Sequence, residues 1–171
     1  MSPLAEVLHG AGVRITGSDA HESGAVEHLR ALGVPVTIGH LPESVEGADC
    51  VIRTAAVHDD NPEIAAARAA GIPIFERAQA WGHLMRSYKN AICVAGTHGK
   101  TTTTTMAAWF NRVAGGGGSA FLGGISKNFG SNLVLGPGPR LVVEADEFDR
   151  SFLQLHPDAA VVTAADADHL D

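Results

Sequence analysis

Short apolar runs alternate with helical patterns along the first half of the chain. Runs rich in β-branched residues indicate strands at 13–16, 36–38, 50–52 and 72–75. Helical patterns lie around them, at 4–9, 24–32 and 62–70. Gly33 and Gly71 stand where the last two of these helices should end. Strands that alternate with helices predict an α/β fold with a parallel sheet covered on both faces.

The second half continues this alternation after a polar stretch at 87–90, which we interpret as a linker. Further strands are expected from Ile92, near 119–122, at 140–145 and at 159–164, with a helix at 100–112. The glycine tract at 115–118 is expected to form a flexible solvent loop. These patterns predict two α/β units, at about 1–88 and 89–171.

The segment 91–106, AICVAGTHGKTTTTTM, has the layout of a phosphate site. Glycines let backbone N–H groups approach an anion, and the N-terminus of the following helix adds partial positive charge. Lys100 adds a full positive charge, and Thr101 or Thr102 can place a hydroxyl on a phosphate-bound Mg²⁺. The residues expected to contact the phosphates are Gly96, Thr97, His98, Gly99, Lys100, Thr101 and Thr102.

This loop is a compressed variant of the usual phosphate-binding loop. The usual pattern has a glycine five positions before Gly99, where this chain has Val94. The alternative interpretation is a glycine-capped turn between a strand and a helix, with threonines capping the helix. A Gly-Lys-Thr-Thr run directly after a buried strand favours the phosphate site.

Composition excludes several classes of function. The chain has 171 residues, 45% of them hydrophobic and 18% charged, which is typical of a globular protein. A formal net charge of −7 and the lack of a basic stripe argue against nucleic acid as a partner. No apolar run reaches the length of a membrane span, so we expect no membrane insertion and a cytoplasmic location. Cys50 and Cys93 lie in apolar runs and are expected to be buried, without zinc or a disulfide.

Acidic groups follow predicted strands in the second half. Glu144 lies at the end of one strand, where a side chain points into the crevice that binds ligands in parallel sheets. Because Mg²⁺ prefers oxygen donors, Glu144 is a candidate metal ligand, and Asp146 and Glu147 in the same loop rank lower. The alternative for this acidic stretch is a solvated loop.

One histidine follows the last predicted strand. His169 lies beside aspartates, of which Asp166 and Asp168 could orient its ring by accepting hydrogen bonds. A purely structural histidine is the alternative. In the first half, Ser18 and Asp19 end a strand run, and Asp19 could bind a nucleotide ribose or base, or else cap the next helix.

Four stretches together resemble one family. They are A-G-T-H-G-K-T-T from Ala95, Gly17-Ser18-Asp19, the run 142–149 (VVEADEFD) and the run 166–171 (DADHLD). They are similar to the Mur ligases, the amide-forming enzymes of peptidoglycan precursor synthesis. Within that family they most resemble the members that join L-alanine to UDP-N-acetylmuramate. The resemblance implies a truncated Rossmann-like UDP-substrate unit, 1–88, followed by the start of a P-loop ATPase domain, 89–171.

The resemblance also implies cofactors, substrates and roles. ATP and Mg²⁺ would be the cofactors, with UDP-N-acetylmuramate and L-alanine joined through an acyl phosphate. Lys100, Glu144 and His169 match catalytic positions, and Thr101, Glu144 and His169 would surround the metal. Positions that match the family's substrate contacts are Ser18, Asp19, Thr54, Ala55, Arg77 and Lys127.

Both ends differ from the family pattern. In the family, a glycine-rich turn precedes the residues that match Met1 and Ser2, and the ATPase sheet continues past Asp171. We therefore expect the 171-residue chain alone to make no ligation product. Three alternatives stay open: a sister ligase that attaches a peptide to the same sugar nucleotide, a simple nucleotide-dependent switch or ATPase, and a nucleotide-binding remnant without catalysis.

Overall fold

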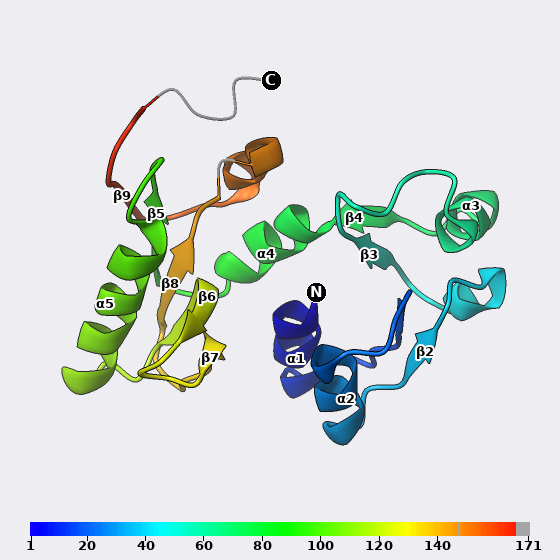
Figure 1. Cartoon of the computed structure of the whole chain (residues 1–171), viewed down its shortest axis with the longest axis horizontal. Coiled ribbons are helices and arrows are strands. Elements are labelled where there is room, and N and C mark those ends of the chain that lie inside the picture. The colour runs from blue at the N-terminus through cyan, green and yellow to red at the C-terminus, as the bar shows by residue number, and fades with distance from the viewer. Residues whose placement is uncertain (147, 167–171) are drawn as a thin grey trace. The chain divides into compact units, whose positions relative to one another are not determined.

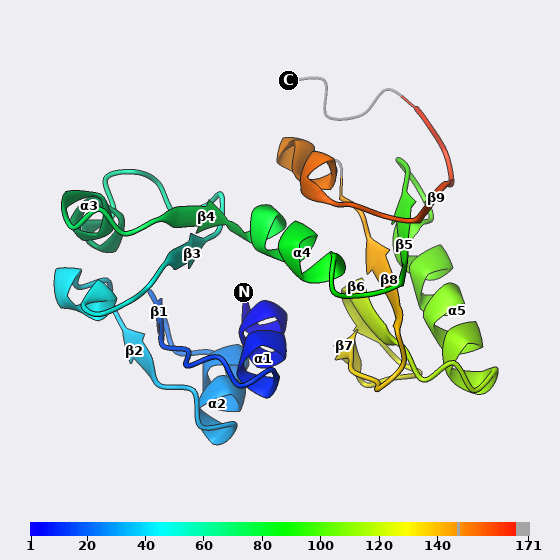
Figure 2. The same cartoon turned by 180° about the vertical axis from the view of Figure 1, so that it is seen from behind.

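A computed structural model describes residues 1–146 and 148–166. The chain divides into two compact units, Met1–Arg77 and Ala78–Asp171 (Figure 1 and Figure 2). This division lies earlier than the expected one between 88 and 89. The mixture of helices and parallel strands confirms the predicted α/β class.

The first unit contains short strands and helices in alternation. Its elements are α1 (Ser2–Gly10), β1 (Gly17–Asp19), α2 (Gly24–Ala31), β2 (Val36–Ile38), η1 (Pro42–Val45), β3 (Val51–Arg53), α3 (Pro62–Ala69) and β4 (Ile74–Glu76). They form two parallel pairs, β1 with β2 and β3 with β4. The carboxyl ends of each pair therefore lie at one edge, where polar side chains can meet.

Local sequence explains where the helices of this unit begin and end. The Ser23 hydroxyl caps α2 by accepting from the backbone N–H of Val26, and the Asn61 side chain caps α3. Gly33 and Gly71 follow α2 and α3 with positive φ angles of 89° and 68°. The apolar face of α2 packs in a buried cluster of Val26, Leu29, Val34 and Val36.

The second unit is built on one larger sheet. Its elements are α4 (Arg77–Met85), β5 (Asn90–Ala95), α5 (Lys100–Val113), β6 (Ser119–Ser126), β7 (Ser131–Val134), β8 (Arg140–Glu144), η2 (Phe148–Gln154) and β9 (Ala159–Val162). The strand order is β7-β6-β8-β5-β9, and only the β6–β7 pairing is antiparallel among the described residues. Strand β8 is buried on both faces: Leu141 and Val143 pack with Met85 of α4, and Val142 packs with Ala108 of α5 (Figure 1).

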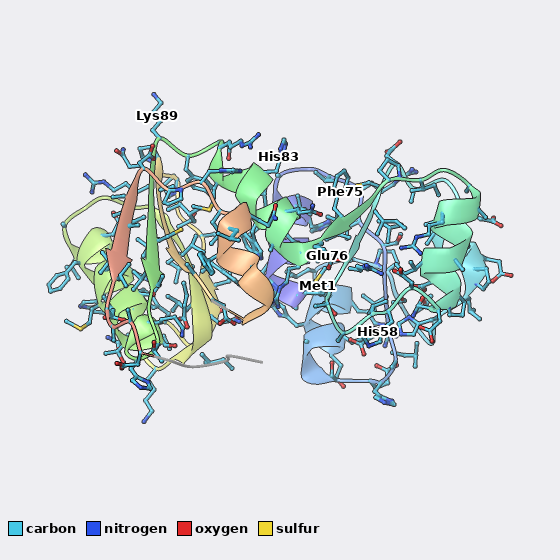
Figure 3. The ribbon with its side chains drawn as sticks, turned by 90° about the horizontal axis from the view of Figure 1, so that it is seen from above. Met1, His58, Phe75, Glu76, His83 and Lys89 are labelled. Carbon is cyan, nitrogen blue, oxygen red and sulfur yellow. The ribbon has the colours of Figure 1, made fainter. Side chains whose placement is uncertain are left out.

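The structure corrects several predicted elements. The first strand is Gly17–Asp19 rather than 13–16, because the parallel partner β2 pairs with that segment. The helix α4 and the strand β7 were not predicted. The expected linker at 87–90 runs into β5, and Lys89 extends into solvent just ahead of that strand (Figure 3).

One further expectation about a single position was wrong. Cys50 is exposed, because it precedes β3 rather than lying in it, whereas Cys93 is buried in β5. Burial raises the pKa of the Cys93 thiol to about 11. The glycine tract is a loop in which packing differs from one position to the next: a Cβ on Gly118 would overlap Asn111 and Arg140, whereas nothing lies within 4 Å of a Cβ on Gly115.

Candidate functional site

The loop between β5 and α5 depends on two glycines. Gly96 has φ 129° and Gly99 has φ 82°, both in the region that favours glycine. A Cβ on Gly96 would also overlap the Thr163 hydroxyl and the backbone of Ala164. The chain therefore turns from strand to helix with its backbone closely packed against the segment after β9.

That segment anchors the loop through hydrogen bonds. The Thr97 N–H donates to the Ala164 carbonyl at 3.1 Å. The Thr97 hydroxyl accepts from the Asp166 N–H at 2.9 Å and lies 3.2 Å from the Asp166 carbonyl. The Thr163 hydroxyl donates toward the Ala95 and His98 carbonyls. These contacts fix the loop at the carboxyl ends of β5 and β9, the position expected for a ligand site in a parallel sheet.

Lys100 brings positive charge to this loop. Its side chain is half-buried, and Nζ donates to the Gly96 carbonyl at 2.8 Å. The helix that begins at Lys100 has 14 residues, so its N-terminus carries the partial positive charge of a full-length dipole. Loop, helix end and lysine together suit a phosphate group. His98, Gly99, Thr101 and Thr102 are exposed at the same place.

Two candidate oxygen ligands meet beside the loop. The Thr101 hydroxyl donates to Glu144 Oε1 at 2.9 Å, and the Gly123 N–H donates to Glu144 Oε2 at 2.8 Å. Octahedral Mg²⁺ binds oxygens at about 2.0–2.1 Å, which places adjacent ligands about 2.9 Å apart. The Thr101–Glu144 pair therefore fits two neighbouring positions of a magnesium shell. Within the described residues, no group of three or more His, Cys, Asp and Glu could hold a metal ion.

Some of the residues predicted for this site are not described. Glu147, Asp168 and His169 lie outside the described residues. Asp166 is exposed, and its backbone N–H binds Thr97. Sequence reasoning missed Gly123 and Thr163. Their only signal was position: Gly123 lies on a strand beside β8, and Thr163 directly follows a strand beside β5.

The predicted substrate residues of the first unit lie at strand ends. Asp19 accepts from the His21 N–H at 3.2 Å, and the cap of α2 is Ser23 instead. The interpretation of Asp19 as a helix cap was therefore wrong. Ser18 contacts the side chains of His40 and Glu63.

Four further predicted residues lie in turns or at element ends. Thr54 and Ala55 follow β3 in a turn closed by the Val57 N–H and the Thr54 carbonyl at 3.0 Å. Arg77 is exposed and follows β4; burial, and secondly the Arg77 charge, lowers the pKa of the Met1 amino group. Lys127 is exposed in the turn between β6 and β7. The roles of these residues stay predictions.

Comparison with known proteins identifies the family. The model described as "Mur ligase family, catalytic domain" matches residues 1–89. The chain belongs to the Mur ligase family. This confirms the resemblance drawn from the four sequence stretches.

The similar relatives carry one name. The UDP-N-acetylmuramate–L-alanine ligase of Legionella pneumophila (strain Corby) is 51% identical over 171 residues, which are 100% of this chain and 36% of the relative. The ligase of the same name from Hyphomonas neptunium is 48% identical with the same coverage. The Mur ligase chain thus spans about 36% of the length of these relatives.

Solved structures share the fold. The UDP-N-acetylmuramate-alanine ligase MurC of Thermotoga maritima matches with TM-score 0.89 and 37% identity, over 99% of this chain and 40% of that one. The UDP-N-acetylmuramate:L-alanyl-gamma-D-glutamyl-meso-diaminopimelate ligase of Neisseria meningitides matches with TM-score 0.88 and 28% identity, over 100% and 59%. In the described part of this Mur ligase chain, no helix is long and apolar enough to cross a membrane.

Proposed function

We propose that the protein is an ATP-dependent ligase that joins L-alanine to UDP-N-acetylmuramate, with ATP and Mg²⁺ as cofactors. One observation carries the proposal: the Thr101–Glu144 oxygen pair lies beside the loop that presents Lys100, as a metal-bound nucleotide requires. The names of the similar relatives, at 51% and 48% identity over the whole chain, support the choice of substrates. Because ATP and the sugar nucleotide are metabolites of the cytoplasm, we place the reaction there.

The proposed reaction needs positioning and charge neutralisation. ATP would supply its γ-phosphoryl group to the lactyl carboxylate, giving an acyl phosphate and releasing ADP. The amine of L-alanine would then attack the acyl carbon, and inorganic phosphate would leave as the amide bond forms. Lys100 and the loop N–H groups would hold the β- and γ-phosphates, and Thr101 and Glu144 would hold Mg²⁺. His169 is assigned to the same surroundings by the family resemblance alone.

The sugar nucleotide is assigned to the first unit. Ser18 and Asp19 lie in β1, Thr54 and Ala55 follow β3, and Arg77 follows β4. Each position lies near the carboxyl end of a parallel strand, where ligands of α/β sheets bind. The Arg77 guanidinium suits a phosphate or a carboxylate. Lys127 of the second unit is assigned to the muramyl sugar by resemblance.

A ligation assay on the gene product tests the proposal. The protein is supplied with ATP, Mg²⁺, UDP-N-acetylmuramate and either L-alanine or an L-alanyl peptide, and ADP and the ligated product are measured. ADP release that requires L-alanine supports the proposal. Preference for the peptide would instead indicate the reaction named for the Neisseria meningitides neighbour, and ADP release without any amine would indicate a simple ATPase.

A further inference from the structure

Three polar side chains from separate segments meet in the first unit. The Ser18 hydroxyl donates to Glu63 Oε2 at 2.7 Å and lies 3.2 Å from His40 Nδ1. His40 Nδ1 is 3.5 Å from the same Glu63 oxygen. Ser18 lies in β1, His40 follows β2 and Glu63 lies in the first turn of α3. We name these three residues the Ser18 cluster.

The carboxylate determines which atoms of the cluster donate. An ionised carboxylate only accepts hydrogen bonds, so the Ser18 proton points to Glu63. His40 Nδ1 then faces the lone pairs of the Ser18 oxygen and of the carboxylate. That contact is attractive only when Nδ1 carries a proton, so the Nε2 atom of the neutral ring is an acceptor.

The Glu63 side chain is more buried than the His40 side chain. The Glu63 side chain is 13% exposed, whereas the His40 side chain is 27% exposed. The other Glu63 oxygen, Oε1, is buried and has no hydrogen-bond partner among the described residues. Glu63 is therefore placed to orient its neighbours, while the more exposed His40 ring can meet a ligand, with the half-buried Ser18 hydroxyl beside it.

We infer that Glu63 is a positioning residue that presents Ser18 Oγ and His40 Nε2 as acceptors to a hydrogen-bond donor of the uridine nucleotide. The donor is a ribose hydroxyl or the imide N–H of the base. The identity of this ligand rests on the proposed function. The location supports the inference, because β1 and β2 are parallel and the cluster lies toward their carboxyl ends.

The His40 ring gives a direct spectroscopic readout. Long-range ¹H–¹⁵N correlation spectra of the labelled 171-residue chain, taken at a pH where the ring is neutral, distinguish protonated from unprotonated ring nitrogens. We expect a protonated Nδ1 in the wild type. In Glu63→Gln the amide can donate to Ser18, whose proton then turns to His40, so the ring should change to the Nε2–H form. In Ser18→Ala the Nδ1–H form should persist, because Nδ1 still faces Glu63.

The same variants test recognition of the ligand. UDP and its 2′,3′-dideoxy and N3-methyl analogues are titrated into the wild type, into Glu63→Gln and into the exposed control Glu43→Gln. Glu63→Gln should weaken UDP binding roughly three- to tenfold, the effect of one misdirected hydrogen bond, whereas Glu43→Gln should not. The analogue that lacks the recognised donor should bind both proteins equally.

Several results would overturn the inference. They are an Nε2–H ring in the wild type, an unchanged ring in Glu63→Gln, no response of the cluster to UDP, or equal losses for UDP and both analogues. Ligase activity is measured separately. A cluster that responds to UDP in a protein without L-alanine-dependent ADP release would contradict only the proposed function, and an active ligase with an unchanged ring in Glu63→Gln would contradict only this inference.

Discussion

The Thr101–Glu144 pair makes a sharp prediction for the variant Glu144→Gln. Glutamine has nearly the same shape as glutamate. Its amide oxygen can accept from the Gly123 N–H, and its NH₂ group can donate to the Thr101 hydroxyl, which rotates. Both contacts persist, and only the negative charge is lost. The variant therefore separates the metal-binding role of Glu144 from its structural role.

The structure indicates the size of both effects. Two hydrogen bonds change from charge-assisted to neutral, and because Glu144 is only half-buried we expect the free energy of unfolding to fall by about 1 kcal/mol. Loss of a charged ligand should raise the Mg²⁺ concentration needed for nucleotide binding by roughly 10- to 100-fold, which corresponds to about 1.4–2.7 kcal/mol.

The assay is a titration of a fluorescent ATP analogue into the 171-residue chain at stepped Mg²⁺ concentrations. With Mg²⁺, Glu144→Gln should bind more weakly than the wild type. Without Mg²⁺, it should bind at least as tightly, because a negative charge near the phosphates has been removed. The exposed control Glu43→Gln should match the wild type throughout. An equal loss of affinity at every Mg²⁺ concentration would refute the metal assignment and leave Glu144 a structural role.

Three further predictions concern the loop and the core. Lys100→Ala should abolish ATP binding in the same titration, because only helix and backbone dipoles then face the phosphates; wild-type affinity would contradict the loop assignment. Gly96→Ala should lower the free energy of unfolding by about 2 kcal/mol or more in urea denaturation, because of its φ of 129° and the overlap of a Cβ. Gly124→Ala, whose Cβ would meet only one atom at 3.9 Å, is the matched control. Burial raises the pKa of the Cys93 thiol to about 11, so as the pH rises this thiol ionises in the unfolded chain before it does so in the folded chain. Ionisation therefore favours the unfolded state, and the urea midpoint should fall as pH rises from about 9 toward 11.

Contiguous motifs were predictable from the sequence because their chemistry is local. The run from Gly96 to Thr102 contains its own turn glycines, its helix start and its charged group. The helices α2 and α3 were predicted near their true bounds, because Pro62 in the first turn of α3 and a glycine after each helix are signals carried by neighbouring residues. None of these features needs knowledge of a distant partner.

Elements that depend on distant partners were not predictable in the same way. Strand β1 is defined by hydrogen bonds to β2, so its place at Gly17–Asp19 follows from pairing rather than from the β-branched run at 13–16. Helix α4 contains Gly82 and has little helical pattern. Tertiary packing supports it instead, through buried Trp81 stacked on Phe121 and buried Met85.

The phosphate loop and the Ser18 cluster also differ in whether their residues are neighbours in the sequence. This difference affects how each site should respond to substitution. The phosphate loop is assembled from neighbours in sequence, but the oxygens proposed to bind the metal come from α5 and β8, and parallel pairing of β6 with β8 brings Gly123 to the same carboxylate. The Ser18 cluster as a whole has no contiguous signal, because only Ser18 lies in a recognisable run and the three residues come from β1, the loop after β2 and α3. Because Glu63 acts only through its neighbours, Glu63→Gln should change ligand selectivity, whereas Lys100→Ala removes a charge that contacts the ligand itself and should abolish binding.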